Sequence, residues 1–202
     1  MSCLPAVKAI GLAVTLCAAG AVIHAQEPQG PVYMTYPPLP ASLTELLKGR
    51  DFVVRGTIVK WAGEPYEMES GAGIVRIPST VYRVHVLEVF DNGDSSAALV
   101  GEQIMVRHLG FRSGDVRGGV DDSVPPLVVG REYLLVVFKH ASTGTFRLEY
   151  GGNGVFERDK GLVRLGGQSA LASRYRGTSW AAFLKALREA AMASRRAAAP
   201  AE

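Results

Sequence analysis

The most constraining feature of this sequence is a series of short runs, between residues 51 and 165, in which apolar side chains recur at every second position. A period of two places alternate side chains on opposite faces of a β-strand, whereas an α-helix requires a period near 3.6. Sequences rich in glycine, aspartate and asparagine separate the runs and are typical of tight turns. The pattern therefore predicts a mainly β domain.

Two positions indicate where these strands bend. Within residues 81–90 the apolar positions are even-numbered up to Val86 and odd-numbered from Leu87 onward. A slip of one residue turns every later side chain to the other face of the sheet, and a β-bulge absorbs such a slip while bending the strand. We expect a bulge at Val86–Leu87. Gly56, in the middle of another run, marks a second bend.

Strongly bent strands favour closure into a small barrel, because closure removes the exposed edges through which sheets aggregate. We expect an OB-like barrel of five to six strands. The run over residues 133–138 is apolar throughout, which is typical of a strand buried on both faces. The expected strands cover residues 52–61, 81–90, 103–109, 133–138, 145–150, 155–156 and 162–165.

Helical periodicity occurs on both sides of the strand region. Ser42 and Glu45 form a capping-box pattern that predicts a short N-terminal helix. After Gly177 the apolar residues recur at i, i+3, i+4 and i+7, which predicts an amphipathic C-terminal helix with one buried stripe. The residues of that stripe are Trp180, Phe183, Leu184 and Leu187.

The first residues of the chain resemble a secretory signal. Lys8 precedes a weakly polar to apolar run over residues 9–23, which is shorter than the about 20 residues that a membrane span needs. Cleavage after Ala21 or Ala25 would export the chain, so we expect a periplasmic or secreted protein. An uncleaved membrane anchor and lipid attachment at Cys17 are the alternatives.

The remaining chain divides by composition. Residues 26–40 contain five prolines, which predicts an extended tether rather than a packed element. We expect a signal peptide over 1–25, the tether over 26–40, the barrel with both helices over 41–193, and a disordered tail over 194–202. No second apolar run is long enough to span a membrane, so no integral span is expected in the mature chain.

Four segments carry a resemblance to a known group of domains. In rhythm and turn placement they resemble exported bacterial OB-like barrels akin to netrin- and TIMP-type domains, which implies a fold more than an activity. TIMP-like inhibitors grip a catalytic zinc through an N-terminal cysteine. Both cysteines here, Cys3 and Cys17, lie in the leader, so that mechanism is not carried over. The segments are DFVVRGTIV (51–59), YRVHVLEV (82–89), VGREYLLVV (129–137) and YGGNGVF (150–156).

Composition and motifs give little support to an enzyme or a nucleic-acid binder. The formal net charge is only +3, so no nucleic-acid partner is expected. His85, His108 and His140 occupy three different expected strands, without a paired-histidine motif or a cysteine ligand. No nucleophile elbow or phosphate-binding glycine motif is present. We expect no cofactor, no metal and no catalytic residue.

Two long polar segments, residues 62–79 and 110–126, are the candidate working surface. Connections in compact domains usually have about 4–6 residues, and longer ones are often functional. We expect a non-enzymatic binding domain that contacts a protein or a cell-envelope polymer through these loops. The alternatives are an enzyme with a site assembled from separated polar residues and an oligosaccharide-binding OB-type module. Tyrosine, phenylalanine and arginine supply much binding energy at interfaces, so the candidate binding residues are Tyr66, Phe111, Arg112 and Arg117.

Overall fold

The computed structural model of the chain describes most of the expected domain. The described residues are 40–48, 52–70, 73–90, 99–109, 111–113, 116–118, 126–140, 143–165 and 169–198. The expected signal peptide and all of the expected tether except Pro40 lie outside them. Within the described ranges, no helix has both the length and the apolar character needed to cross a bilayer.

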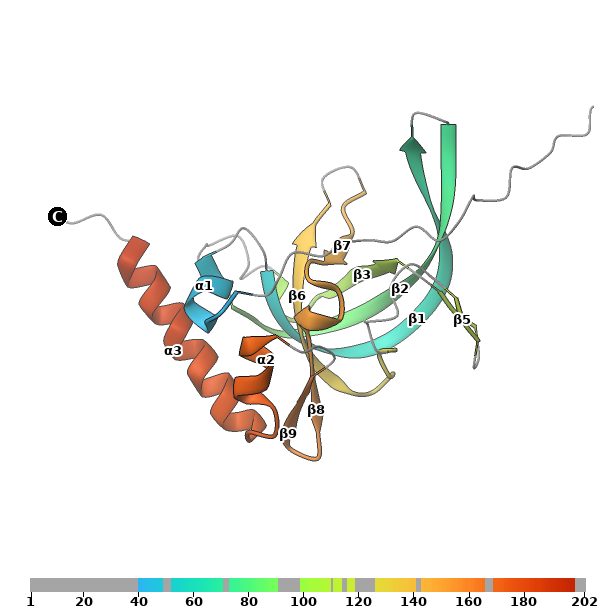
Figure 1. Cartoon of the computed structure of the whole chain (residues 1–202). Helices are drawn as coiled ribbons and strands as arrows, with labels where there is room; N and C mark the ends of the chain where they lie inside the picture. The colour runs from blue at the N-terminus through green and yellow to red at the C-terminus, as the bar shows by residue number, and fades with distance from the viewer. Residues whose placement is uncertain are drawn as a thin grey trace, which may run out of the picture.

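The described part of the chain is mainly β and contains three α-helices (Figure 1). The helices are α1 (Leu43–Lys48), α2 (Ala170–Tyr175) and α3 (Trp180–Ala198). The strands are β1 (Phe52–Ser70), β2 (Gly73–Phe90), β3 (Gln103–Leu109), β4 (Phe111–Ser113), β5 (Val116–Gly118), β6 (Glu132–Lys139), β7 (Phe146–Leu148), β8 (Val155–Asp159) and β9 (Leu162–Leu165). A short 3-10 helix, Gly151–Gly154, joins β7 to β8.

Five strands close into a ring. The main sheet has the order β1-β2-β3-β7-β6-β8-β9, and β1 also pairs with β6, which connects the two ends of the five-strand series. The pair β3–β7 is parallel, whereas the other pairs of the ring are antiparallel. The expected mainly β fold with closure over five strands and a C-terminal helix is confirmed. Strands β8 and β9 extend the sheet from β6, and β4 and β5 form a separate hairpin.

The expected bend in β1 and β2 is present. The register between these strands shifts at Arg55–Gly56, which leaves Leu87 as the extra residue on β2 and confirms the predicted bulge. A Cβ atom at Gly56 would lie 2.6 Å from Val84 Cγ1 and 2.7 Å from the carbonyl oxygen of His85. Only glycine allows the two strands to approach this closely at the bend.

The segment 62–79, expected as a long loop, is instead a paired β-hairpin. Pairing of β1 with β2 continues from Ala62 opposite Val81 to Ser70 opposite Gly73. These residues form an arm that extends beyond the ring (Figure 1). The sequence expectation was wrong because polar side chains do not prevent pairing in an antiparallel hairpin, where the backbone groups satisfy each other and the side chains can face water.

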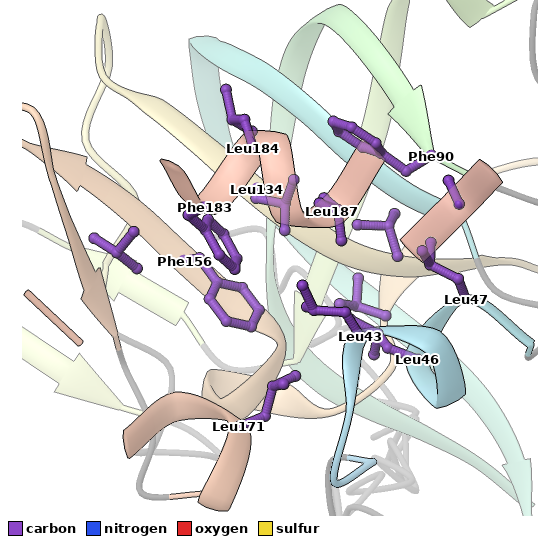
Figure 2. Packing of buried hydrophobic residues seen from close by; sticks show 14 of the residues in the cluster. Leu43, Leu46, Leu47, Phe90, Leu134, Phe156, Leu171, Phe183, Leu184 and Leu187 are labelled. Atoms are coloured by element: carbon purple, nitrogen blue, oxygen red, sulfur yellow. The ribbon is translucent and has the colours of Figure 1, made fainter. Parts of the chain in front are cut away.

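Two apolar cores lie on the two faces of the sheet. Strand β6 contributes to both, because Leu134 and Val136 point to one core and Tyr133, Leu135 and Val137 point to the other. The alternation confirms that this apolar run is buried on both faces. One core fills the inside of the ring. The other lies between the outer face of the sheet and the helices, where side chains from β6, β8, α1, α2 and α3 meet (Figure 2).

The helices cover the outer core. The four stripe residues of α3, from Trp180 to Leu187, are buried as predicted. The helix continues to Ala198, so residues 194–198 of the expected tail are helical, and Ser194 is buried. Alanine and arginine are strong helix formers, which accounts for the extension. At α1, the amide of Glu45 donates to Ser42 Oγ at 3.2 Å, the hydrogen bond that the capping pattern predicts.

Candidate functional site

Two arginines lie side by side at the seam between β3 and β7, the parallel pair of the ring. These parallel strands pair Val106 with Phe146, and Arg107 with Arg147. Since Val106 and Phe146 point into the core of the ring, the next residue on each strand points outward. Directly opposed like charges on neighbouring strands destabilise a sheet unless other groups compensate them.

Arg107 is compensated on one side of its guanidinium. Its Nη1 donates to Ser79 Oγ at 2.7 Å, and its Nη2 lies 3.2 Å from Glu64 Oε2 in an ion pair. Both partners belong to the arm. Arg107 Nε, however, is buried and has no hydrogen-bond partner. The side chain is 12% exposed, so water does not readily replace the missing partner.

Arg147 is held by an aromatic ring rather than by an ion pair. Its guanidinium carbon lies 4.3 Å from the centroid of the Tyr66 ring, and that of Arg107 lies 5.6 Å from the same centroid. Both distances are within the range of cation–π attraction. Arg147 Nε and Nη2 are buried, and within the part of the chain that the structure describes neither has a hydrogen-bond partner.

A pocket of about 230 Å³ opens beside these two arginines. We call it the arginine pocket. Its walls come from β3, β6, β7 and the residue after β7, so it lies over the seam between β3 and β7. Three of its lining side chains are apolar, two are arginines, and one each is a histidine and a carboxylate. The lining residues are Arg107, His108, Leu109, Phe138, Arg147, Leu148 and Glu149.

The environment of this seam lowers the pKa of a nearby histidine. Burial, and secondly the charge of Arg147, lower the pKa of His140, because both disfavour the imidazolium form. His140 lies at the end of β6, directly after the exposed Lys139. The lowered pKa favours the neutral form of His140, so the charged groups that line the pocket are the guanidinium groups of Arg107 and Arg147 and the carboxylate of Glu149.

The structure brings one of the four sequence-predicted binding residues to this site. Tyr66, which is paired with Ile77 in the arm, lies over both guanidinium groups. Phe111 and Arg112 lie on β4 and Arg117 lies on β5, with Arg112 opposite Arg117 in the hairpin. Strand β4 packs against β1 and β2. Residues 110, 114, 115 and 119–125 of that expected loop lie outside the described residues.

Sequence reasoning missed Arg107 and Arg147. Each follows an apolar core residue in an alternating strand, so the outward orientation of each could have been inferred. Their proximity depends on a parallel pairing between strands far apart in the chain, for which the sequence has no local signal. Among the described residues, no group of three or more histidine, cysteine, aspartate or glutamate side chains is arranged to hold a metal ion.

No protein-family model matches the chain, and no curated protein matches it significantly.

Proposed function

We propose that this protein is an exported, non-enzymatic binding domain that contacts a protein or a cell-envelope polymer through the arm and the arginine pocket. The observation that carries the proposal is the set of three buried guanidinium nitrogens, on Arg107 and Arg147, that lack a hydrogen-bond partner. Buried polar groups in native proteins are almost always paired, so an unpaired set beside a pocket is best explained by a ligand that pairs with it.

The two arginines favour binding over catalysis, whereas His108 and Glu149 in the same lining are the side chains that the enzyme alternative would use. A guanidinium stays protonated in proteins, so it holds an anion but does not transfer a proton. Tyrosine and arginine are also enriched among the residues that supply most of the binding energy at protein interfaces. The oligosaccharide-binding alternative has less support, since Trp61 is the one aromatic residue among the well exposed apolar side chains that the structure describes.

Site-specific photo-crosslinking in the cell envelope tests the proposal. A photoreactive amino acid at Lys139, which is exposed and adjacent to Phe138 of the pocket, should capture one defined partner. The same amino acid at Lys185, exposed on α3, is the matched control and should not capture it. The capture at position 139 should be lost in the variant Arg147→Lys. Equal capture from both positions, or capture that is independent of Arg147, would contradict the proposed function.

Export rests on the leader sequence and has a separate test. N-terminal sequencing of the protein from the envelope fraction should begin at Val22 or Gln26. Recovery of the chain with its original N-terminus from the cytoplasm would overturn the exported location and leave the binding proposal to the crosslinking result.

A further inference from the structure

The arginine pocket has properties that define the ligand more closely. Resting on the proposed function, we infer that it binds one carboxylate group carried on an apolar body about the size of a six-membered ring. The inference follows from the free edge of one guanidinium, from the charges around it, and from the size and lining of the pocket.

The free edge of Arg147 has the geometry of a carboxylate receptor. Nε–H and Nη2–H lie on the same edge of the planar guanidinium and point in parallel directions, which matches the two oxygens of a carboxylate. Both nitrogens lack a partner. The guanidinium carbon lies 4.3 Å from the centroid of the Tyr66 ring, so cation–π attraction holds the group in place, and Arg147 itself lines the pocket.

Burial strengthens an interaction at this edge. The two nitrogens are removed from water, so each unmade hydrogen bond costs the protein free energy that a ligand oxygen would restore. Charges also attract each other more strongly in a partly dehydrated pocket than in bulk water. A single anionic group placed against Arg147 therefore gains more than it would at an exposed arginine.

The charges near the pocket favour one negative charge on the ligand. Arg107 already forms an ion pair with Glu64, whereas Arg147 forms none among the described residues. Arg147 is thus the guanidinium of the pocket that has no ion-pair partner. Glu149 also lines the pocket and limits its net positive charge, so a ligand with more than one negative charge is disfavoured. A carboxylate carries one charge at neutral pH, whereas a phosphate monoester carries nearly two.

The size and the apolar walls define the rest of the ligand. An engineered cavity of about 150 Å³ holds benzene, and this pocket measures about 230 Å³. Leu109, Phe138 and Leu148 provide apolar surface beside the arginines. An aromatic or branched aliphatic group next to the carboxylate fits these walls. Both a small organic acid and the carboxyl end of a protein chain with an apolar last residue have this chemistry.

Titration with defined probes tests the inference. The full chain is produced in cells that process it, purified, and titrated with benzoate, the neutral isostere benzamide, acetate and phenyl phosphate while the Nε–H signal of Arg147 is followed by NMR. Benzoate should shift that signal and bind at least tenfold more tightly than benzamide and acetate, and phenyl phosphate should bind no more tightly than benzoate. An Arg147 signal that does not respond to benzoate would overturn the inference.

Variants separate this inference from the proposed function. Arg147→Lys keeps the positive charge but removes the two parallel donors, so its affinity for benzoate should fall at least tenfold. Arg164→Lys is the matched control, because Arg164 is an exposed residue of β9, and this variant should bind benzoate as tightly as the parent does. Unchanged binding by Arg147→Lys would overturn the inference. If capture of the crosslinked partner requires Arg147 but benzoate does not bind, the carboxylate inference fails and the proposed function stands. If benzoate binds but capture of the partner does not depend on Arg147, the proposed function fails.

A pair of peptides distinguishes the two sources of the carboxylate. One hexapeptide ends in phenylalanine with a free carboxyl group, and its partner has the same sequence with a C-terminal amide. If the natural ligand is a chain end, the free acid should shift the Arg147 Nε–H signal at least as strongly as benzoate, and the amide should not. If benzoate binds and both peptides fail, the ligand is a small acid that the pocket encloses.

Discussion

Two groups of arginines in this molecule differ in whether their guanidinium donors are hydrogen-bonded. On the helix side of the ring, Arg55 Nε donates to Glu132 Oε1 at 2.6 Å and Nη1 donates to Glu88 Oε2 at 3.1 Å. At the seam between β3 and β7, Arg147 forms no ion pair with a described residue, and two of its buried nitrogens are unpaired. The same side-chain type thus has satisfied donors in one region and unsatisfied donors in the other.

The helix-side group is a connected network. Glu88 accepts hydrogen bonds from Arg55 and from Arg188 of α3, and Glu132 accepts them from Arg55, Arg158 and Trp180. Burial alone would raise the pKa of both carboxyl groups. The hydrogen bonds outweigh burial, so the pKa values of Glu88 and Glu132 lie below the ordinary range. The network joins β1, β2, β6 and β8 to the C-terminal helix.

The difference indicates two purposes for buried charge. A satisfied network adds stability or fixes the arrangement of the elements that it joins. Unpaired buried donors reduce stability, and a protein retains them where they serve another role, most often at a functional site. Stability measurements should therefore distinguish the two regions, with large losses on the helix side and no loss at the seam.

The largest loss is expected for Trp180→Ala. Trp180 is buried, its ring lies 5.9 Å from that of Phe183, and its Nε1 donates to Glu132. Removing a buried aromatic side chain typically costs about 3–5 kcal/mol, and here the change also removes one donor of the network. Thermal unfolding followed by circular dichroism should show a clear fall in Tm. A Tm equal to that of the parent would show that α3 does not stabilise the ring.

The second loss is expected for Arg55→Met. This change keeps the length of the side chain and leaves Glu88 and Glu132 without their shared partner. Removing one member of a fully buried pair costs about 3–5 kcal/mol, and partial exposure should reduce the cost to about 2–3 kcal/mol. Urea unfolding measures this difference. A cost below that of Arg164→Met, a change at an exposed arginine, would contradict the role assigned to the network.

Much of the helix-side region could be predicted from the sequence, because its signals are local. The stripe from Trp180 to Leu187 and the phase change at Leu87 each lie within a few residues, and the structure confirms both. The ion pairs of that region were not predictable. Arg188 and Glu88 are far apart in the chain and meet only because α3 packs beside β2.

The candidate site was less predictable. Residue type alone predicts Tyr66 as a binding residue, in a segment expected to be a loop. The structure places it on a strand, over two arginines that no local sequence pattern brings together. Pairing of β3 with β7 decides that arrangement, and only two residue pairs define it. A contact that depends on so short a parallel pairing has almost no trace in a single sequence.

The third effect depends on pH and is expected for Glu132→Gln. Because the folded-state pKa of Glu132 is lowered, its ion pairs stabilise the protein above the unfolded-state pKa, about 4.3, and this contribution is lost as the pH falls through the folded-state value. Glu132→Gln should cost about 1–2 kcal/mol at pH 7. Its Tm should then approach that of the parent as the pH falls below about 4.3, the unfolded-state pKa, and further through the lowered folded-state pKa. A difference in Tm that stays constant from pH 7 into this acidic range would contradict the assigned role of the carboxylate.

The smallest effect, and the one that tests the comparison most directly, is expected for Arg147→Met. The substitution removes two buried donors that have no partner and one of two directly opposed positive charges, while the methionine side chain retains apolar contact with Tyr66 and Phe138. Replacing an unsatisfied buried polar group by an apolar one of similar shape is nearly neutral or stabilising. The free energy of unfolding should therefore stay within about 0.5 kcal/mol of the parent or rise above it. Benzoate binding should be lost in the same variant. A loss of stability as large as that of Arg55→Met would mean that Arg147 supports the fold in the same way as the helix-side arginines, and the contrast between the two regions would fail.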